Sequence, residues 1–295
     1  MNILITGSNG QLGSELKDLE NNYPEHTFFN TDINELDITN KENIETFIKE
    51  NNIECIINCA AYTAVDKAEE NKDLCKLLNE IAPTYLAEAI EKNNGWMIHI
   101  STDYVFGGLS DSYYINEMHN IPYVEADMTI PCGTYGLTKR NGENNIMKVC
   151  SKSIIIRTAW LYSTYGNNFV KTMINLGKTR DKLNVVFDQI GTPTYAYDLA
   201  KTILEIIDKG MISGIYHFTN EGVTSWYDFT KMIHRLSNIN NCKVYPIHTS
   251  EYKTLTRRPQ YSVLDKTKIK ETYHIEIPYW IDSLEKCISK LNIQK

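Results

Sequence analysis

The sequence lacks any stretch in which Lys and Arg gather, and its formal net charge at pH 7 is -7. Proteins that bind nucleic acids usually present a basic surface, so we expect no nucleic-acid partner. No window approaches the roughly 20 apolar residues that span a membrane, and the apolar start of the chain is too short for a signal peptide. These absences favour a protein of the reducing cytoplasm with no membrane contact.

The sequence also lacks a cysteine motif. The seven cysteines are scattered, odd in number and never spaced as C-x-x-C. This pattern argues against a disulfide framework and against a structural zinc site, so we predict no metal ligands. Hydrophobic residues make up 42% of the chain and charged residues 23%, which is ordinary for a folded globular protein and excludes a disordered one.

Short apolar segments alternate with helical patterns in the first half of the chain. The alternation predicts buried strands near residues 2–6, 27–30, 55–60, 96–100 and 153–157. Strands that are apolar on both faces and separated by helices are typical of a parallel sheet covered on both sides. We therefore expect an α/β fold with a doubly wound, Rossmann-type sheet, formed by residues 1–157.

The pattern becomes less regular after residue 157. Helices are expected near residues 169–178, 195–208, 226–236 and 280–291. We predict that residues 158–295 form mainly a smaller substrate-binding lobe, and that some elements, about 185–210, return to the first domain.

Three glycines, Gly7, Gly10 and Gly13, follow the first predicted strand and open the first predicted helix. Without side chains they let the backbone approach a pyrophosphate, and the helix amino terminus adds free N–H groups. Asp32 stands 19 positions after Gly13, where a carboxylate can accept hydrogen bonds from the adenosine ribose. No Arg or Lys adjoins Asp32, which favours NADH or the use of both NADH and NADPH. Asp37 lies nearby and offers a second carboxylate for the same role.

Tyr135 and Lys139 lie four residues apart in a predicted helix, so their side chains share one face. Hydride delivery to a ketone creates an alkoxide that needs a proton, and a tyrosine with a pKa of about 10 is a poor donor near neutrality. A neighbouring ammonium group stabilises the phenolate and lowers that pKa. The helix follows a strand that ends near Thr102, whose hydroxyl can hydrogen-bond a substrate carbonyl.

The glycine loop and residues 58–61, 101–106 and 135–139 together resemble the extended short-chain dehydrogenase/reductase superfamily. Further segments, in order along nearly the whole chain, are similar to the dTDP-4-dehydrorhamnose reductase family: 60–69, 157–162, 166–170, 188–194 and 258–265. The resemblance implies reduction of the C4 keto group of dTDP-4-dehydro-L-rhamnose to dTDP-L-rhamnose, which is used for cell-surface polysaccharide.

The resemblance also implies roles for individual residues. Tyr135 would be the proton donor, Lys139 would lower its pKa and hold the nicotinamide ribose, and Thr102 would orient the carbonyl oxygen. Asp103 stands beside Thr102, and Trp160 would line the sugar or base pocket. The implied cofactor contacts are Gly7, Gly10, Gln11, Leu12, Gly13, Asp32, Asp37, Ile38, Ala60, Ala61, Tyr62, Tyr135 and Lys139.

The sequence departs from the family in places. The family often has His where Tyr62 stands, and the segment 108–133 is longer than expected and carries Tyr113, Tyr114 and Tyr123. A long loop at a catalytic edge can act as a lid that alters which sugar fits. A reductase or epimerase of another nucleotide sugar therefore stays open as an alternative. A non-catalytic, dinucleotide-binding regulatory subunit is a second one, which the intact Thr-Tyr-Lys set disfavours.

Two properties of the family are left open by the sequence. Some members bind Mg2+ at a dimer contact, but the sequence places no ligands for it, so Mg2+ is possible and unsupported. The chain is expected to be a monomer or a homodimer.

Overall fold

The structure is a computed structural model, and it describes residues 1–108 and 121–293. A six-stranded parallel sheet lies at its centre, in the order β10-β5-β4-β3-β1-β2. Its strands are β1 (Asn2–Thr6), β2 (Thr27–Thr31), β3 (Cys55–Asn58), β4 (Trp96–Thr102), β5 (Ser153–Thr158) and β10 (Gly214–His217). The prediction of a doubly wound, Rossmann-type α/β sheet is confirmed.

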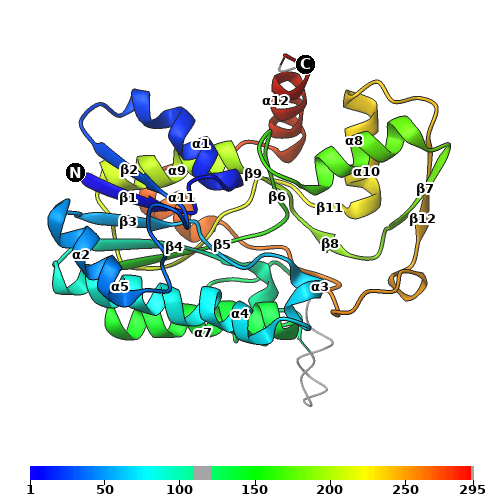
Figure 1. The fold of residues 1–295 in the computed structure, drawn as a ribbon. Coiled ribbons are helices and arrows are strands. Elements are labelled where there is room, and N and C mark those ends of the chain that lie inside the picture. The colour runs from blue at the N-terminus through cyan, green and yellow to red at the C-terminus, as the bar shows by residue number, and fades with distance from the viewer. Residues whose placement is uncertain (109–120, 294–295) are drawn as a thin grey trace.

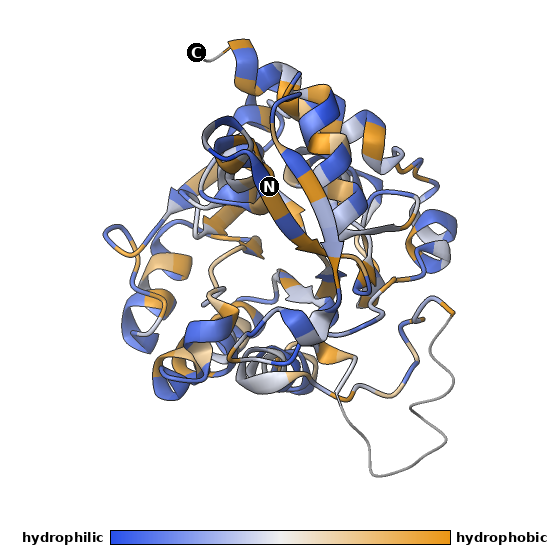
Figure 2. Ribbon diagram, turned by 90° about the vertical axis from the view of Figure 1, so that its right-hand side faces the viewer, coloured by the Kyte–Doolittle hydropathy of each residue, from blue (hydrophilic) through white to orange (hydrophobic). Residues whose placement is uncertain are grey.

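Helices cover both faces of the sheet (Figure 1). One face carries α1 (Gln11–Leu19), α9 (Ala196–Lys209) and α11 (Thr267–Tyr273), and the other carries α2 (Lys41–Glu50), α5 (Ala82–Lys92) and α7 (Gly133–Val149). Figure 2 shows the helices striped in orange and blue, as expected of helices that bury one side only. Each face of the sheet therefore has its own hydrophobic cluster.

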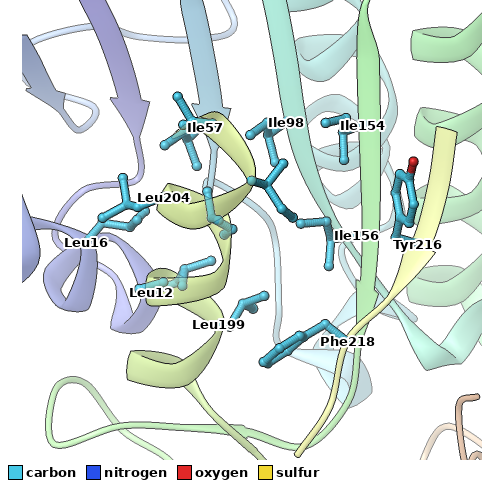
Figure 3. Packing of buried hydrophobic residues seen from close by; sticks show 14 of the residues in the cluster. Leu12, Leu16, Ile57, Ile98, Ile154, Ile156, Leu199, Leu204, Tyr216 and Phe218 are labelled. Carbon is cyan, nitrogen blue, oxygen red and sulfur yellow. The ribbon is translucent and has the colours of Figure 1, made fainter. Parts of the chain in front are cut away.

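The first of these clusters is drawn in Figure 3. Leu12 and Leu16 of α1 meet Leu204 of α9, and both helices pack over Ile57 and Ile98 of the strands. All five side chains are at most 4% exposed. At roughly 1.5–3 kcal/mol for each fully buried aliphatic side chain, this contact holds the amino end of α1 firmly over the sheet.

Residues after β5 form a second group of elements with its own core (Figure 1). Its strands pair in twos, as β6 with β9, β7 with β12 and β8 with β11. The elements are β6 (Leu161–Tyr162), α8 (Phe169–Thr179), β7 (Lys182–Val186), β8 (Ile190–Gly191), β9 (Thr194–Tyr195), β11 (Thr224–Ser225), α10 (Trp226–Leu236), β12 (Lys243–Ile247), η4 (Thr249–Glu251) and α12 (Trp280–Ile293).

The chain after residue 157 also contributes to the sheet layers. Helix α9 packs against α1, and β10 forms one edge of the sheet. The range 185–210, for which a return to the first domain was expected, contains α9, whereas the strand that joins the sheet follows it at 214–217. Strand β7, at 182–186, pairs with β12 outside the central sheet.

Short helical turns complete the first half of the chain. They are η1 (Glu20–Asn22), α3 (Val65–Ala68), α4 (Lys72–Lys76), the π-helical turn η2 (Leu77–Ile81) and η3 (Asp103–Val105). Within the part of the chain that the structure describes, no helix combines the length and the apolar character needed to cross a membrane.

Candidate active site

The carboxyl ends of the central strands border a cavity of about 1000 Å³. Parallel α/β sheets commonly bind their ligands at this edge. The predicted site residues that line it are Gly7, Gly10, Gln11, Leu12, Gly13, Asp32, Asp37, Ile38, Ala60, Ala61, Thr102, Asp103, Tyr135, Lys139 and Trp160. Tyr62 does not line it, and its backbone N–H and C=O are bonded to the Asn79 side chain over 2.8 and 3.0 Å.

The glycine loop joins β1 to α1. Gly7 has a φ of +64°, which favours glycine, and a Cβ there would lie only 2.7 Å from the Ala60 nitrogen. Helix α1 begins after Gly10, which has no side chain to cap the N–H groups of the first turn. An uncapped helix start beside a cavity is suited to an anionic group such as a diphosphate.

Asp32 follows β2 at the edge of the cavity. Its Oδ2 accepts from the Asn9 backbone N–H over 3.1 Å, and its Oδ1 accepts from the Ile33 N–H over 2.9 Å. Lys17 donates to the Asn9 side chain over 3.0 Å. The Lys17 ammonium group is therefore separated from the Asp32 carboxylate in space by the single residue Asn9. Sequence inspection missed Lys17 because the helix, and not the chain neighbourhood of Asp32, brings it there.

Tyr135 and Lys139 both project from α7 into the cavity. The helix lies directly against η3, since a Cβ at Gly136 would overlap the Tyr104 carbonyl oxygen. The Tyr104 ring meets the Tyr135 ring edge-on, with 5.6 Å between the ring centres. This close approach brings the Tyr135 hydroxyl to the end of β4, beside Thr102.

Burial dominates the acid–base behaviour of the site. It raises the pKa of Tyr135 above the ordinary value, and a hydrogen bond with the Thr102 side chain opposes the rise. It also raises the pKa of Asp103 to about 6, opposed by hydrogen bonds that include one from the Thr102 hydroxyl, at 3.1 Å. In the opposite sense, burial lowers the pKa of Lys139 to about 8. Lys139 Nζ lies 3.0 Å from Nε2 of His99.

Aromatic rings close the far side of the cavity. Trp160 has a φ of +49°, unusual for a residue with a side chain, and stacks on Trp226 with 3.5 Å between ring centres. Both rings line the cavity. Trp226 comes from α10, so no pattern near residue 160 pointed to it.

Arg258 also lines the cavity, and its role was not predicted. It donates to an Asp66 oxygen over 2.9 Å, which fixes its position on the rim. Residue 258 begins one of the segments that resemble the family, and this resemblance was the available signal.

The long segment before α7 lies partly outside the described residues, and so do Tyr113 and Tyr114. Tyr123 is described: its ring stacks on Phe106 with 4.2 Å between ring centres, and its N–H donates to the Val263 carbonyl over 2.9 Å. The part of this segment around Tyr123 is therefore anchored to the core.

The candidate metal ligands among the described residues do not line the cavity. Within the described ranges, Glu25, His26 and Asp208 form one group of side chains close enough to share a metal ion, and none of them lines the cavity.

A parallel sheet, a glycine loop at the start of α1, and a Tyr–Lys pair beside the end of β4 define a short-chain dehydrogenase/reductase. The family model described as the RmlD substrate binding domain matches residues 1–293. The dTDP-4-dehydrorhamnose reductase of Aggregatibacter actinomycetemcomitans is 40% identical, over 96% of this chain and 97% of the relative.

Solved structures agree with this assignment. A dTDP-4-dehydrorhamnose reductase of Clostridium acetobutylicum has a TM-score of 0.90 and 44% identity, covering 99% of this chain and 100% of that one. The dTDP-4-dehydrorhamnose reductase of Bacillus anthracis, solved in complex with NADP, has a TM-score of 0.90 and 38% identity, covering 98% and 99%. The chain belongs to the dTDP-4-dehydrorhamnose reductase family, and the resemblance seen in the sequence is confirmed.

Proposed function

We propose that the protein reduces the C4 keto group of dTDP-4-dehydro-L-rhamnose to give dTDP-L-rhamnose, for the synthesis of cell-surface polysaccharide. The observation that supports the proposal is that Thr102, Tyr135 and Lys139 line the same cavity as the glycine loop. A full-length relative at 40% identity bears the name of this activity. A regulatory subunit would need the nucleotide cavity but not the proton donor.

The chain fits a dinucleotide cofactor, NADPH or NADH, which supplies the hydride. Gly7, Gly10 and the uncapped start of α1 would hold the diphosphate, with Gln11, Leu12 and Gly13 beside it. Asp32 would accept from the adenosine ribose, and Asp37, Ile38, Ala60 and Ala61 line the same cavity. Tyr62 would act through its neighbours, since it does not line the cavity.

The carboxylate of Asp32 disfavours a ribose phosphate at that position by charge repulsion. The Lys17 ammonium, one residue away through Asn9, offsets part of this repulsion. Use of both cofactors, with a preference for NADH, follows from these two opposing charges.

Proton transfer is the task of α7. Thr102 would hold the substrate carbonyl oxygen, and Tyr135 would give its hydroxyl proton to that oxygen as the hydride arrives at C4. The raised pKa of Tyr135 keeps the hydroxyl protonated before the reaction. A positive Lys139 then stabilises the tyrosinate that forms. Asp103, next to Thr102, affects how freely the Thr102 hydroxyl turns to the substrate.

The sugar nucleotide would lie between the sheet edge and the elements that follow residue 157. Trp160 and Trp226 offer a flat stacked wall for the sugar or base, and Arg258 offers a cation for the substrate diphosphate. This division assigns residues 1–157 mainly to the cofactor and residues 158–295 mainly to the substrate.

The test is the loss of reduced-nicotinamide absorbance with enzymatically prepared dTDP-4-dehydro-L-rhamnose, run in parallel with NADH and NADPH. We expect rapid oxidation, with dTDP-L-rhamnose as product. Tyr135→Phe should lose at least a hundredfold in kcat while it binds the cofactor as the wild type does, because only the proton donor is missing. Cofactor binding without turnover in the wild type would instead favour another nucleotide sugar or a regulatory subunit.

A further inference from the structure

A line of buried polar side chains leads from Lys139 across the central sheet. Thr6, Asn58 and His99 are register partners on the neighbouring strands β1, β3 and β4, and each is at most 1% exposed. The Thr6 hydroxyl donates to Asn58 Oδ1 over 2.7 Å, Asn58 Nδ2 lies 2.9 Å from His99 Nδ1, and His99 Nε2 lies 3.0 Å from Lys139 Nζ. The reaction described above uses Lys139 but none of the other three.

Hydrogen bonding fixes the orientation of the Asn58 amide. The Ala60 backbone N–H donates to Asn58 Oδ1 over 3.1 Å, and the Thr6 hydroxyl donates to the same oxygen. The amide NH2 group therefore faces His99, and His99 Nδ1 accepts from it. Because a neutral imidazole carries a single N–H, that hydrogen must then be on Nε2, which points at Lys139.

This arrangement requires Lys139 to accept a hydrogen bond. An ammonium group has three donors and no acceptor, so His99 can donate to Nζ only when Lys139 is a neutral amine. The amine can still donate to the Ile100 carbonyl oxygen, 2.6 Å away. When Lys139 is protonated, Nε2 must accept and the ring proton must lie on Nδ1. The Asn58 oxygen would then turn to His99 and leave the Ala60 N–H without its acceptor.

The other groups that face Lys139 do not decide its charge. Glu143 is paired with Arg157 over 2.7 Å. Burial raises the pKa of the Cys59 thiol to about 12 and raises the pKa of the Cys75 thiol as well, so both are neutral near pH 7. No unpaired anion among the groups that shift the pKa of Lys139 therefore holds it protonated.

We propose that His99 is a positioning residue for Lys139: the tautomer of the ring changes together with the charge of Lys139, and Asn58 favours the tautomer that leaves Lys139 an amine. The inference rests on the proposed function for its effect on turnover. Tyr135 loses its proton to the substrate oxygen, and an ammonium group at Lys139 is needed beside the tyrosinate. The coupling sets the pH at which that ammonium group is lost.

The first test uses the wild-type protein without substrate. Histidine labelled with 15N reports which ring nitrogen of His99 carries the proton, and lysine labelled with 13C at Cε reports the charge of Lys139. His99→Gln and Lys139→Arg assign the two signals. We expect the His99 proton on Nε2 at alkaline pH and on Nδ1 at acid pH, with the same midpoint as Lys139. A single His99 tautomer throughout the titration of Lys139 overturns the proposal.

A second test fixes the His99 ring in one tautomer. Asn58→Asp replaces the amide with a group that only accepts, so His99 should keep its proton on Nδ1 and Nε2 should accept from an ammonium group. We expect the pKa of Lys139 to rise by about 1 unit or more, the equivalent of one buried hydrogen bond. In the His99→Leu background most of this rise should disappear, because only the through-space effect of the charge is left. An equal rise in both backgrounds overturns the coupling.

These readouts separate the inference from the proposed function. They are taken without substrate. Failure to turn over dTDP-4-dehydro-L-rhamnose, together with a joint titration of His99 and Lys139, would therefore contradict the proposed function only. Turnover of this sugar nucleotide, together with a single His99 tautomer at every pH, would contradict the inference only.

Discussion

The buried ion pair between Glu143 and Arg157 is predicted to hold α7, the helix of Tyr135 and Lys139, in place. Glu143 lies one turn after Lys139 on α7, and Arg157 lies on β5. Three hydrogen bonds of 3.0, 3.2 and 2.7 Å join the two side chains, which are 2% and 3% exposed. The Phe106 ring lies under the guanidinium group, 5.1 Å from its carbon. The helix that presents Tyr135 is thereby tied to the sheet by a pair that water does not reach.

Arg157→Met should reduce the free energy of unfolding by about 3–5 kcal/mol, because it leaves the Glu143 carboxylate buried without its partner. The double variant Arg157→Met, Glu143→Leu should recover most of this loss, since it removes both charges and keeps the volume apolar. One guanidinium nitrogen, Nη1, has no partner among the described residues, so the pair itself is not optimal and its apolar replacement need not cost much.

The measurement is urea unfolding at pH 7, followed by circular dichroism, for the wild type, the two single variants and the double variant. Turnover of the double variant adds a second readout, because the placement of Tyr135 depends on α7. A loss below about 1 kcal/mol for Arg157→Met would show that the pair is screened and does not act as a buried one. A double variant as unstable as Arg157→Met would refute the unpaired charge as the cause.

Three further predictions concern the cavity. Asp103→Asn should gain stability relative to the wild type as pH rises from about 4 to about 6, by on the order of 2–3 kcal/mol in urea unfolding. Between these pH values the unfolded chain releases the Asp103 proton while the folded protein still holds it, because its pKa is raised to about 6, so the wild type loses stability there. A pH-independent difference would contradict this. Asp32→Ala should raise the Kd of NADH more than that of NADPH in fluorescence titrations, and equal changes would mean that Asp32 does not contact the ribose. Trp226→Ala should raise the KM for the sugar nucleotide about 2–10-fold with kcat nearly unchanged, since an aromatic pair contributes about 0.5–1.5 kcal/mol; an unchanged KM would place the sugar elsewhere.

Much of the fold could be predicted because local patterns of apolar residues indicate many of its strands and helices. The apolar segments at residues 2–6 and 153–157 agree with β1 and β5 to within a residue, and the helix predicted at 226–236 agrees with α10. Strands buried on both faces have a distinct composition, which is why a parallel sheet could be inferred. The glycine loop could be placed for the same reason, since it joins one such strand to an amphipathic helix.

Other features depend on contacts between distant segments and could not be predicted. Residues 71–93 are divided into α4, the π-helical turn η2 and then α5, with Pro83 in the first turn of α5. The π-helical turn places Asn79 where its amide bonds both backbone groups of Tyr62, a contact over 17 residues. The sequence alone contains no signal for that pairing, and none for the Trp160–Trp226 stack.

Residue types predicted which groups meet in the site, but not how their protons are held. The sequence-based argument gives Lys139 the task of lowering the pKa of Tyr135. In the structure burial raises the pKa of Tyr135 and lowers that of Lys139, and Nζ contacts His99 and the Ile100 carbonyl. We therefore propose that Lys139 acts in the transition state, where it stabilises the tyrosinate that forms. It does not need to lower the pKa of the Tyr135 hydroxyl before the reaction.

This assignment predicts which group the alkaline pH dependence of turnover reports. Burial raises the pKa of Tyr135, so we expect a fall in kcat/KM near pH 8, which reports groups of the free enzyme, to come from Lys139, whose charge is lost there. Lys139→Arg carries a guanidinium group that stays charged at every accessible pH. Its kcat should be lower because the larger guanidinium group does not fit a site that holds an amine. The fall in kcat/KM near pH 8 should be absent. If that fall persists unchanged in Lys139→Arg, the titrating group is another one, and the charge of Lys139 does not control the reaction.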